Sequence, residues 1–103
     1  MDYKNRIAFL IIIAERKKKD ELLPLLMQTG ARIINTVYGK GSVRASTFMD
    51  ILGFIPEENK IIITCLIPKE KSDSLLETLN EEYSFNKSNT GIAFTIPVEG
   101  LSF

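Results

Sequence analysis

The sequence has 103 residues, in which 13 Lys and Arg balance 13 Asp and Glu, so it predicts one domain, residues 1–103, without net charge. This balance gives no overall field to attract nucleic acid, which is therefore not an expected partner. There is no His and only one Cys, which removes the commonest metal ligand, the usual general base and an internal disulfide. Most hydrolase chemistry is disfavoured.

The first predicted element is a strand over residues 5–14. Residues 7–14 of it are continuously apolar, too short for a core helix and too uniform for a half-exposed strand, so we expect a central strand covered on both faces. It is also well short of the roughly 20 residues that cross a bilayer, and no signal-peptide cleavage site follows it. A cytoplasmic protein without direct membrane insertion is expected.

A charged connection, residues 15–20, leads to the first predicted helix, from about Glu21 to Thr29. Its leucines have a helical distribution, and Gly30 supplies a stop signal. Pro24 limits where this helix begins, because proline fits only the first turn without loss of a hydrogen bond.

The remaining pattern predicts strands over residues 31–38, 60–67 and 92–96, with Pro97 just beyond the last strand or at an edge. A second helix, capped by Ser72 or Asp73, ends near Tyr83. The order strand, helix, strand, strand, helix, strand predicts an α+β fold, a ferredoxin-like βαββαβ sandwich with a four-stranded antiparallel sheet and both helices on one face. Because the first strand is apolar on both sides, the open sheet face is expected to pack against another subunit.

Residues 39–59 form a long connection between the second and third strands, and such segments are usually functional or disordered. Its start, Gly39-Lys40-Gly41, could form a nest of backbone N–H groups for phosphate, but it is more typical of an ordinary tight turn. Arg44 could add charge to such a site, and Lys87 could reach an anion from the turn before the last strand. Arg32 precedes the glycines on the strand.

The second half of this connection is unexpectedly apolar. These side chains either cover a sheet of the same chain or a neighbour, or are presented to a partner protein. The residues concerned include Phe48, Met49, Leu52 and Phe54.

Two other features have plain structural interpretations. Lys17-Lys18-Lys19 could bind phosphate or acidic lipid, but it is more typical of a solvated linker before a helix. Cys65 lies in an apolar strand and is interpreted as a small core residue. No pair of carboxylates converges as an acid and base.

Several short motifs together resemble the PII signal-transduction superfamily over nearly the whole chain. They are listed here in chain order: Thr29-Gly30-Ala31, Thr36-Val37-Tyr38-Gly39-Lys40-Gly41, Ile67-Pro68, and Thr90 to Glu99, which includes Phe94-Thr95-Ile96-Pro97-Val98-Glu99. In that family a glycine ends the first helix, a Val-x-Gly-x-Gly pattern leads into the T-loop, and the last strand carries a similar Phe-x-x-Pro-Val-Glu motif.

The resemblance implies a ferredoxin-like homotrimer that binds adenine nucleotides in clefts between subunits and engages a regulated protein, such as a membrane transporter, through the T-loop. It implies no enzymatic activity. On this reading the T-loop is the segment 39–59, Gly39 and Gly41 approach phosphate, and Lys40 or Arg44 adds charge. The turn from Lys87 to Gly91 is the facing loop, and Thr36 contacts the nucleotide across the cleft.

Three departures from the family pattern bear on the effector. The loop before the last strand reads Lys87-Ser88-Asn89-Thr90-Gly91 instead of a Gly-Asp-Gly-Lys type, residues 39–59 lack the modified tyrosine, and the family's C-terminal Arg-x-Arg has no counterpart. They favour a smaller or different effector, or none, over ATP bound in the usual manner.

The sequence therefore leads to one main hypothesis and two alternatives. The main hypothesis is a PII-like regulator of nitrogen signalling that senses a small effector, with an adenine nucleotide as the candidate, and acts through residues 39–59. The alternatives are a small ferredoxin-like enzyme and a structural oligomeric adaptor without a ligand. The sequence itself names neither effector nor partner.

Overall fold

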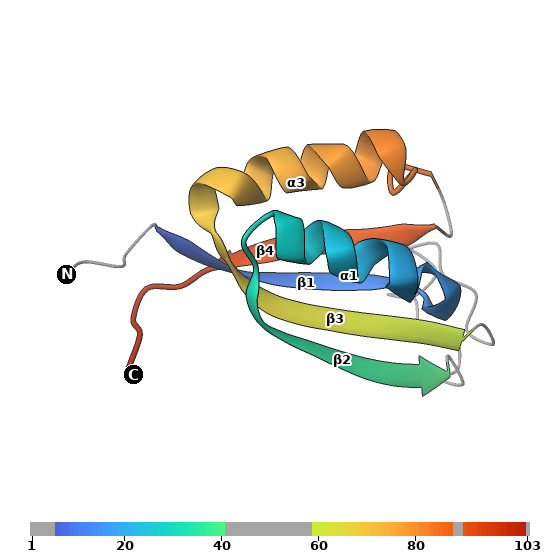
Figure 1. Ribbon diagram of the computed structural model, residues 1–103, viewed down its shortest axis with the longest axis horizontal. Coiled ribbons are helices and arrows are strands. Elements are labelled where there is room, and N and C mark those ends of the chain that lie inside the picture. The colour runs from blue at the N-terminus through green and yellow to red at the C-terminus, as the bar shows by residue number, and fades with distance from the viewer. Residues whose placement is uncertain (1–5, 41–58, 88–89, 103) are drawn as a thin grey trace, which may run out of the picture.

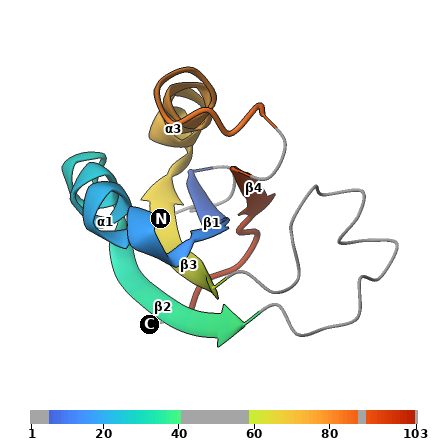
Figure 2. The same ribbon diagram turned by 90° about the vertical axis from the view of Figure 1, so that its right-hand side faces the viewer.

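The computed structural model describes residues 6–40, 59–87 and 90–102. Within these ranges the chain forms β1 (Ile7–Glu15), the short 3₁₀ turn η1 (Arg16–Lys18), α1 (Lys19–Gln28), β2 (Arg32–Lys40), β3 (Asn59–Pro68), α3 (Lys69–Glu82) and β4 (Gly91–Pro97). The strands form one antiparallel sheet in the order β2-β3-β1-β4. Both helices pack on the same face of this sheet, which confirms the predicted ferredoxin-like βαββαβ sandwich (Figures 1 and 2).

The core lies between the sheet and the two helices. Alternate residues of β1 and β3 point toward the helices and are fully buried. From β1 they include Leu10 and Ile12, from β3 Ile61 and Ile63, and α1 adds Leu22 and Leu26. Cys65 is buried in the same layer, as predicted.

The other face of the sheet has no helix over it. On β1 this face carries Ile7, Phe9, Ile11 and Ile13, which are only partly buried. The expectation that the first strand is covered on both faces therefore holds for one face within a single chain. The opposite face leaves apolar side chains accessible.

The first helix ends as predicted but begins earlier. Gly30 adopts a φ of 91°, and the N–H of Ala31 donates to the Leu26 carbonyl at 3.0 Å, a combination typical of a glycine-terminated helix. The prediction that the helix starts at about Glu21 was wrong by two residues, so Pro24 lies beyond the first turn. Because Pro24 has no N–H, the carbonyl four residues before it lacks its helical hydrogen bond. This carbonyl lies at an exposed position, where water can donate to it.

The predicted cap of the second helix was also wrong. Helix α3 begins at Lys69, directly after Pro68, and Ser72 is buried within its first turn. The Ser72 hydroxyl donates to the Lys69 carbonyl at 2.7 Å, while the Lys69 N–H donates to the Arg6 carbonyl at 2.8 Å. A backbone contact thus replaces the side-chain cap that the sequence suggested.

Pro97 ends β4, which pairs only with β1 and is an edge strand, as expected for a proline in a sheet. The other edge strand, β2, has an irregular register between Arg32 and Asn35, where Ile33 adopts a φ of 53°. None of the helices in the described ranges is long and apolar enough to cross a membrane.

Candidate functional site

One end of the sheet holds several of the described residues that the sequence analysis singled out, among them Gly39, Lys40 and Gly91. Strands β1 and β2 finish there and β3 and β4 begin there, because the register pairs Glu15 with Lys60, Lys40 with Asn59 and Ala14 with Gly91. We call this end, marked by Glu15, Lys40, Asn59 and Gly91, the loop end. Residues 41–58 connect two of its strands.

The predicted ligand residues fall into two groups at opposite edges of the sheet. Thr36, Gly39 and Lys40 lie on edge strand β2, whereas Gly91 begins edge strand β4. Two strands separate these edges, which places the groups about 14 Å apart at the usual spacing of neighbouring strands. Within one chain, the structure does not bring the two groups together.

Of the remaining predicted residues, Lys87 lies within the described part of the chain and the others do not. Lys87 lies in the turn after α3, with an exposed side chain and a backbone N–H that donates to the Ser84 carbonyl at 2.9 Å. Lys87 is therefore grouped with Gly91, and not with Thr36, Gly39 and Lys40 on β2. The predictions for Gly41, Arg44, Phe48, Met49, Leu52 and Phe54 fall outside the described residues.

Residues on β2 face alternate sides of the sheet. Thr36 pairs with Ile63 and lies on the side of the helices, whereas Gly39 pairs with Lys60 on the open side. Arg32 lies at the far end of the same strand, and its Nη1 donates to the Ala31 carbonyl at 3.3 Å. Arg32 therefore lies far from the loop end, both along the chain and in space.

The two glycines of the candidate site differ in their surroundings. A Cβ built on Gly91 would lie 2.5 Å from Cζ of Phe85, so internal packing requires this glycine. A Cβ on Gly39 would meet no atom within 4 Å. Packing within the described fold does not require a glycine at position 39. The absence of a side chain leaves the backbone accessible just before the long segment begins.

Arg16 is a residue of this site that the sequence analysis missed. It follows β1 directly, and its Nη2 donates to the Gly39 carbonyl at 3.3 Å. Its guanidinium lies 4.8 Å from the centre of the Tyr38 ring, and Lys19 Nζ lies 5.2 Å from the same ring. A side-chain hydrogen bond with Tyr38 raises the pKa of Lys19. The βαββαβ order itself places the ends of β1 and β2 together, and that signal could have identified Arg16.

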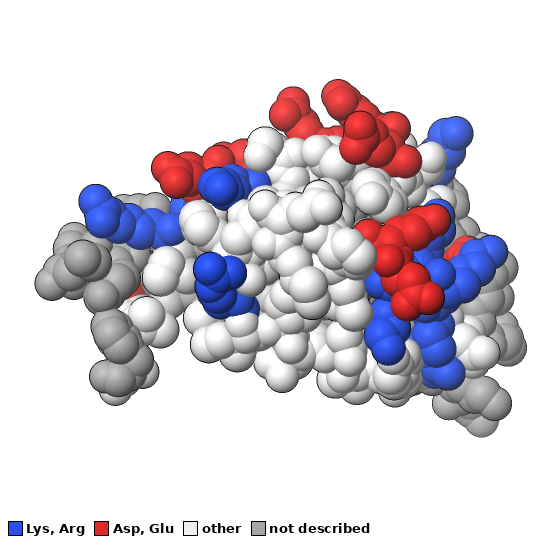
Figure 3. Space-filling view, viewed as in Figure 1, with Lys and Arg blue, Asp and Glu red and all other residues white. Residues whose placement is uncertain are grey.

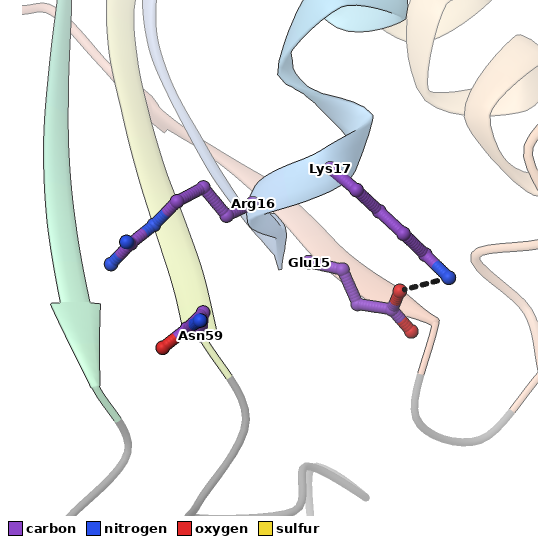
Figure 4. A pocket seen from close by; sticks show the side chains of 4 residues that line it. All are labelled: Glu15, Arg16, Lys17 and Asn59. Carbon is purple, nitrogen blue, oxygen red and sulfur yellow. Dashed lines mark ion pairs between the residues drawn. The ribbon is translucent and has the colours of Figure 1, made fainter.

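A pocket of about 550 Å³ opens at the loop end. Its described lining residues are Glu15, Arg16, Lys17 and Asn59, drawn in Figure 4. Lys17 Nζ forms an ion pair with Glu15 Oε2 at 3.1 Å. Arg16 points away from this pair, toward the end of β2 (Figure 4).

Charge is unevenly distributed over the surface. Basic side chains gather at the loop end with some acidic ones among them, whereas acidic side chains predominate along the top of the molecule, over α3 (Figures 1 and 3). The basic residues there include Arg16, Lys17 and Lys18 of η1. In a chain without net charge, this basic cluster is a local electropositive region, and it lies at the same end of the sheet as Gly39.

The one thiol of the chain is unsuited to nucleophilic chemistry. Cys65 is 1% exposed, and burial raises its pKa to about 11. At neutral pH it remains a protonated thiol within the core. It supports the fold, and the described part of the loop end holds basic and amide groups suited to binding an anion.

Comparison with known proteins is consistent with this geometry. Residues 7–102 match the family model described as nitrogen regulatory protein P-II. No curated protein matches the sequence significantly.

Solved structures share the fold. A PII-like protein named CPII from Thiomonas intermedia K12, bound to ADP, AMP and acetate, is 26% identical over 89% of this chain and 87% of its own, with a TM-score of 0.66. A PII-like signaling protein from Thermus thermophilus is 20% identical over 89% of this chain and 85% of its own, with a TM-score of 0.65. CPII has also been solved with ADP, AMP and bicarbonate, and that structure is 23% identical, covers 93% of each chain and has a TM-score of 0.63.

The family match covers nearly the whole chain, including all four strands of the sheet. The chain belongs to the nitrogen regulatory protein P-II family.

Proposed function

We propose that this protein is a cytoplasmic homotrimer that binds an adenine nucleotide in the clefts between subunits and regulates a partner protein, such as a membrane transporter, through residues 39–59. The family membership supports the signalling role. The effector, the assembly and the partner are the parts that experiment must decide.

The open face of the sheet supports self-association. It presents apolar side chains from all four strands, and Val37, Phe94 and Ile96 are 57%, 43% and 48% exposed. Apolar area of this extent is costly in water and is commonly covered by another chain. The register places these side chains on the same face as Phe9, Ile11, Ile13, Ile62 and Leu66.

The separation of the two residue groups carries the proposal of a site between subunits. Gly39 and Gly91 lie at the same end of the sheet but on opposite edge strands, about 14 Å apart. A small group such as a single phosphate cannot contact both within one chain. In a ring of subunits, the β2 edge of one chain can face the β4 edge of the next, which would join the groups.

On this proposal the residues divide between two subunits. One contributes Gly39 and Lys40 with Gly41 and Arg44, and also Thr36. The neighbouring subunit contributes Lys87 and Gly91. The open space around Gly39 supports a close approach of the ligand to its backbone.

The solved relatives indicate which ligands to test first. Thiomonas CPII has been solved with ADP and AMP, in one structure with acetate and in another with bicarbonate. Adenosine mono- and diphosphates are therefore preferred candidates for this chain.

The assembly and the ligand can be measured on one preparation. We expect light scattering to give three times the chain mass, and titration calorimetry to show saturable binding of AMP or ADP at one site per chain. Nucleotide binding should also raise the melting temperature, because it selects the folded state. A monomer would contradict the assembly, and absence of heat with AMP, ADP, ATP and cyclic dinucleotides would contradict the effector.

Residues 39–59 are proposed to contact the partner through Phe48, Met49, Leu52 and Phe54. Deletion of residues 44–54 separates this role from a purely structural adaptor. If the segment is regulatory, the trimer survives and capture of the partner is lost. Dissociation of the trimer would instead favour the adaptor.

A further inference from the structure

Another cavity lies between helix α3 and edge strand β4, on the side of the sheet that carries the helices (Figures 1 and 2). Its volume is about 230 Å³, and its lining comes from α3, the turn after it and the start of β4 in one chain. Sites for drug-sized ligands usually have volumes of roughly 300–1,000 Å³. This cavity therefore suits a ligand of few atoms, and a whole nucleotide is too large for it.

A small residue of β4 creates the cavity. Ala93 pairs with Ile12, which is fully buried under the helices, so Ala93 also faces them. Alanine extends only a methyl group toward α3, and this leaves room beside Leu76 and Leu79 of the helix. Phe85 completes an apolar wall. The cavity can therefore accept a hydrocarbon group.

The charge beside this cavity is negative. Glu77 follows one of the lining residues directly and is exposed. The C-terminal end of α3 also lies here, and its last carbonyl groups carry a partial negative charge. Figure 3 shows acidic side chains gathered over α3. Residues 75–82 of the helix hold no Lys or Arg, and the acidic residues among them are Glu77, Glu81 and Glu82.

Strand β4 supplies a backbone acceptor at the same place. It pairs only with β1, so its other edge is free of a neighbouring strand in the sheet. In an antiparallel pair, successive residues direct their N–H and C=O groups alternately toward the partner strand and away from it. Either Ile92 or Ala93, both of which line the cavity, therefore directs its carbonyl toward the free edge.

We propose that this cavity binds a compact apolar ammonium ion, such as a branched alkylamine, with its hydrocarbon body between α3 and β4 and its charged head toward Glu77. The body gains hydrophobic free energy against Leu76, Leu79 and Ala93. An alkylamine is protonated at neutral pH, as a Lys side chain is, so the carboxylate and the end of the helix attract it. A carboxylate with the same body would be repelled.

The test compares isopentylamine, isopentyl alcohol and isovalerate, which share one hydrocarbon body, on the full chain at constant ionic strength. Calorimetry measures the affinity, and the backbone amide NMR signals of Leu79 and Ala93 report the location. We expect the amine to bind saturably and to shift both signals. The alcohol should bind about threefold more weakly, the scale of an exposed ion pair, and isovalerate should not bind. Equal affinity for amine and isovalerate, or unshifted signals, would overturn the proposal.

Methylamine tests the contribution of the hydrocarbon body. It carries the same charge but has too little apolar surface to fill the cavity, so it should bind more than about tenfold more weakly than isopentylamine. Equal affinities for the two amines would show attraction by surface charge alone and would contradict a site between α3 and β4.

Glu77→Gln removes the charge and nearly preserves the shape of the side chain. It should weaken binding of the amine about threefold and leave binding of the alcohol unchanged. Glu70→Gln is the matched control, because it makes the same change in the first turn of α3, at the end of the helix away from the cavity. Equal losses in both variants would contradict a specific role of Glu77.

Ala93→Val tests the cavity without changing any charge. It places two more methyl groups in the cavity, and valine is well suited to a strand. It should weaken binding of both amine and alcohol about tenfold or more. Unchanged affinities in a folded Ala93→Val protein would place the site elsewhere, whereas Glu77→Gln tests the proposal independently of how well Ala93→Val folds.

The inference is separate from the proposed function, because one chain forms the whole cavity and the ligand has the opposite charge to a nucleotide. The amine titration is repeated in the presence of AMP. Unchanged binding would support a separate site, and displacement by AMP would overturn it. A monomeric chain, or one that binds no nucleotide, would contradict the proposed function and leave this inference standing if the amine still binds.

Discussion

The ring of Phe85 packs directly over the backbone of Gly91, so closely that a Cβ at position 91 would lie 2.5 Å from Cζ and 2.7 Å from Cε1 of the ring. Phe85 follows α3, where its N–H donates to the Leu79 carbonyl at 3.0 Å, and Gly91 begins β4. The contact thus fixes the turn between these elements against the core. It provides a structural reason for a glycine that the sequence analysis assigned to ligand binding.

Gly91→Ala is expected to destabilise the fold by about 1–3 kcal/mol, the range typical of overpacking in a well-packed region. The added methyl group must displace the Phe85 ring or the start of β4. Urea unfolding followed by circular dichroism measures the change. In the background of Phe85→Ala, which creates the missing space, the same substitution should cost much less. Equal costs in both backgrounds would contradict the proposed clash.

Gly39→Ala provides the contrasting case. Its Cβ would meet nothing within 4 Å, so the free energy of unfolding should change by less than about 1 kcal/mol. If the backbone at Gly39 approaches a ligand, the same methyl group should nevertheless weaken nucleotide binding. Calorimetry and unfolding on one protein sample distinguish the effects. Wild-type affinity in a stable Gly39→Ala protein would exclude the close approach.

Hydrophobic patterning was sufficient to predict the strands and their order. β-branched runs bounded by Gly and Pro identify β2 and β3, and the stop at Gly30 follows from its need for a positive φ. The start of α3 was missed because a backbone contact, and not a side-chain cap, determines it. The 2.8 Å hydrogen bond from the Lys69 N–H to the Arg6 carbonyl joins residues 63 positions apart. Rules based on neighbouring residues cannot predict such a contact.

The candidate site was predictable only in part. The motif around Gly39 was recognised from local sequence, and the structure places it at the loop end. Arg16 was missed because its contact with Gly39 spans 23 positions and depends on the pairing of both strands with β3. Its neighbours Lys17 and Lys18 have the composition of an ordinary solvated linker, which hid the contact of the Arg16 side chain with β2.

Ile11→Glu tests whether the open sheet face is an interface. Ile11 lies at the middle of this face, paired with Thr64 on one side and Phe94 on the other. Because it is partly exposed in a single chain, a carboxylate there is compatible with folding, but burying it between subunits would be costly. We expect light scattering to detect monomers.

Asn80→Glu is the matched control, because it introduces the same charge at an exposed position of α3. It should leave the oligomer intact. An oligomer that persists in a folded Ile11→Glu protein would show that another surface holds the subunits together.

Cys65 should contribute a specific pH dependence to stability. Burial raises the pKa of this thiol from 9.0 to about 11 in the folded protein. Below pH 9 the thiol is protonated in both states, but between pH 9 and 11 the unfolded chain releases the proton while the folded chain retains it. The free energy of unfolding must therefore fall as the pH rises through this window.

Cys65→Ala lacks this titration, whereas the other groups that ionise at high pH remain in both proteins. Urea unfolding at pH 8, 9, 10 and 11 should show the stability of the wild type decreasing relative to Cys65→Ala above pH 9, and a difference that stays constant would indicate that the thiol is not buried as described.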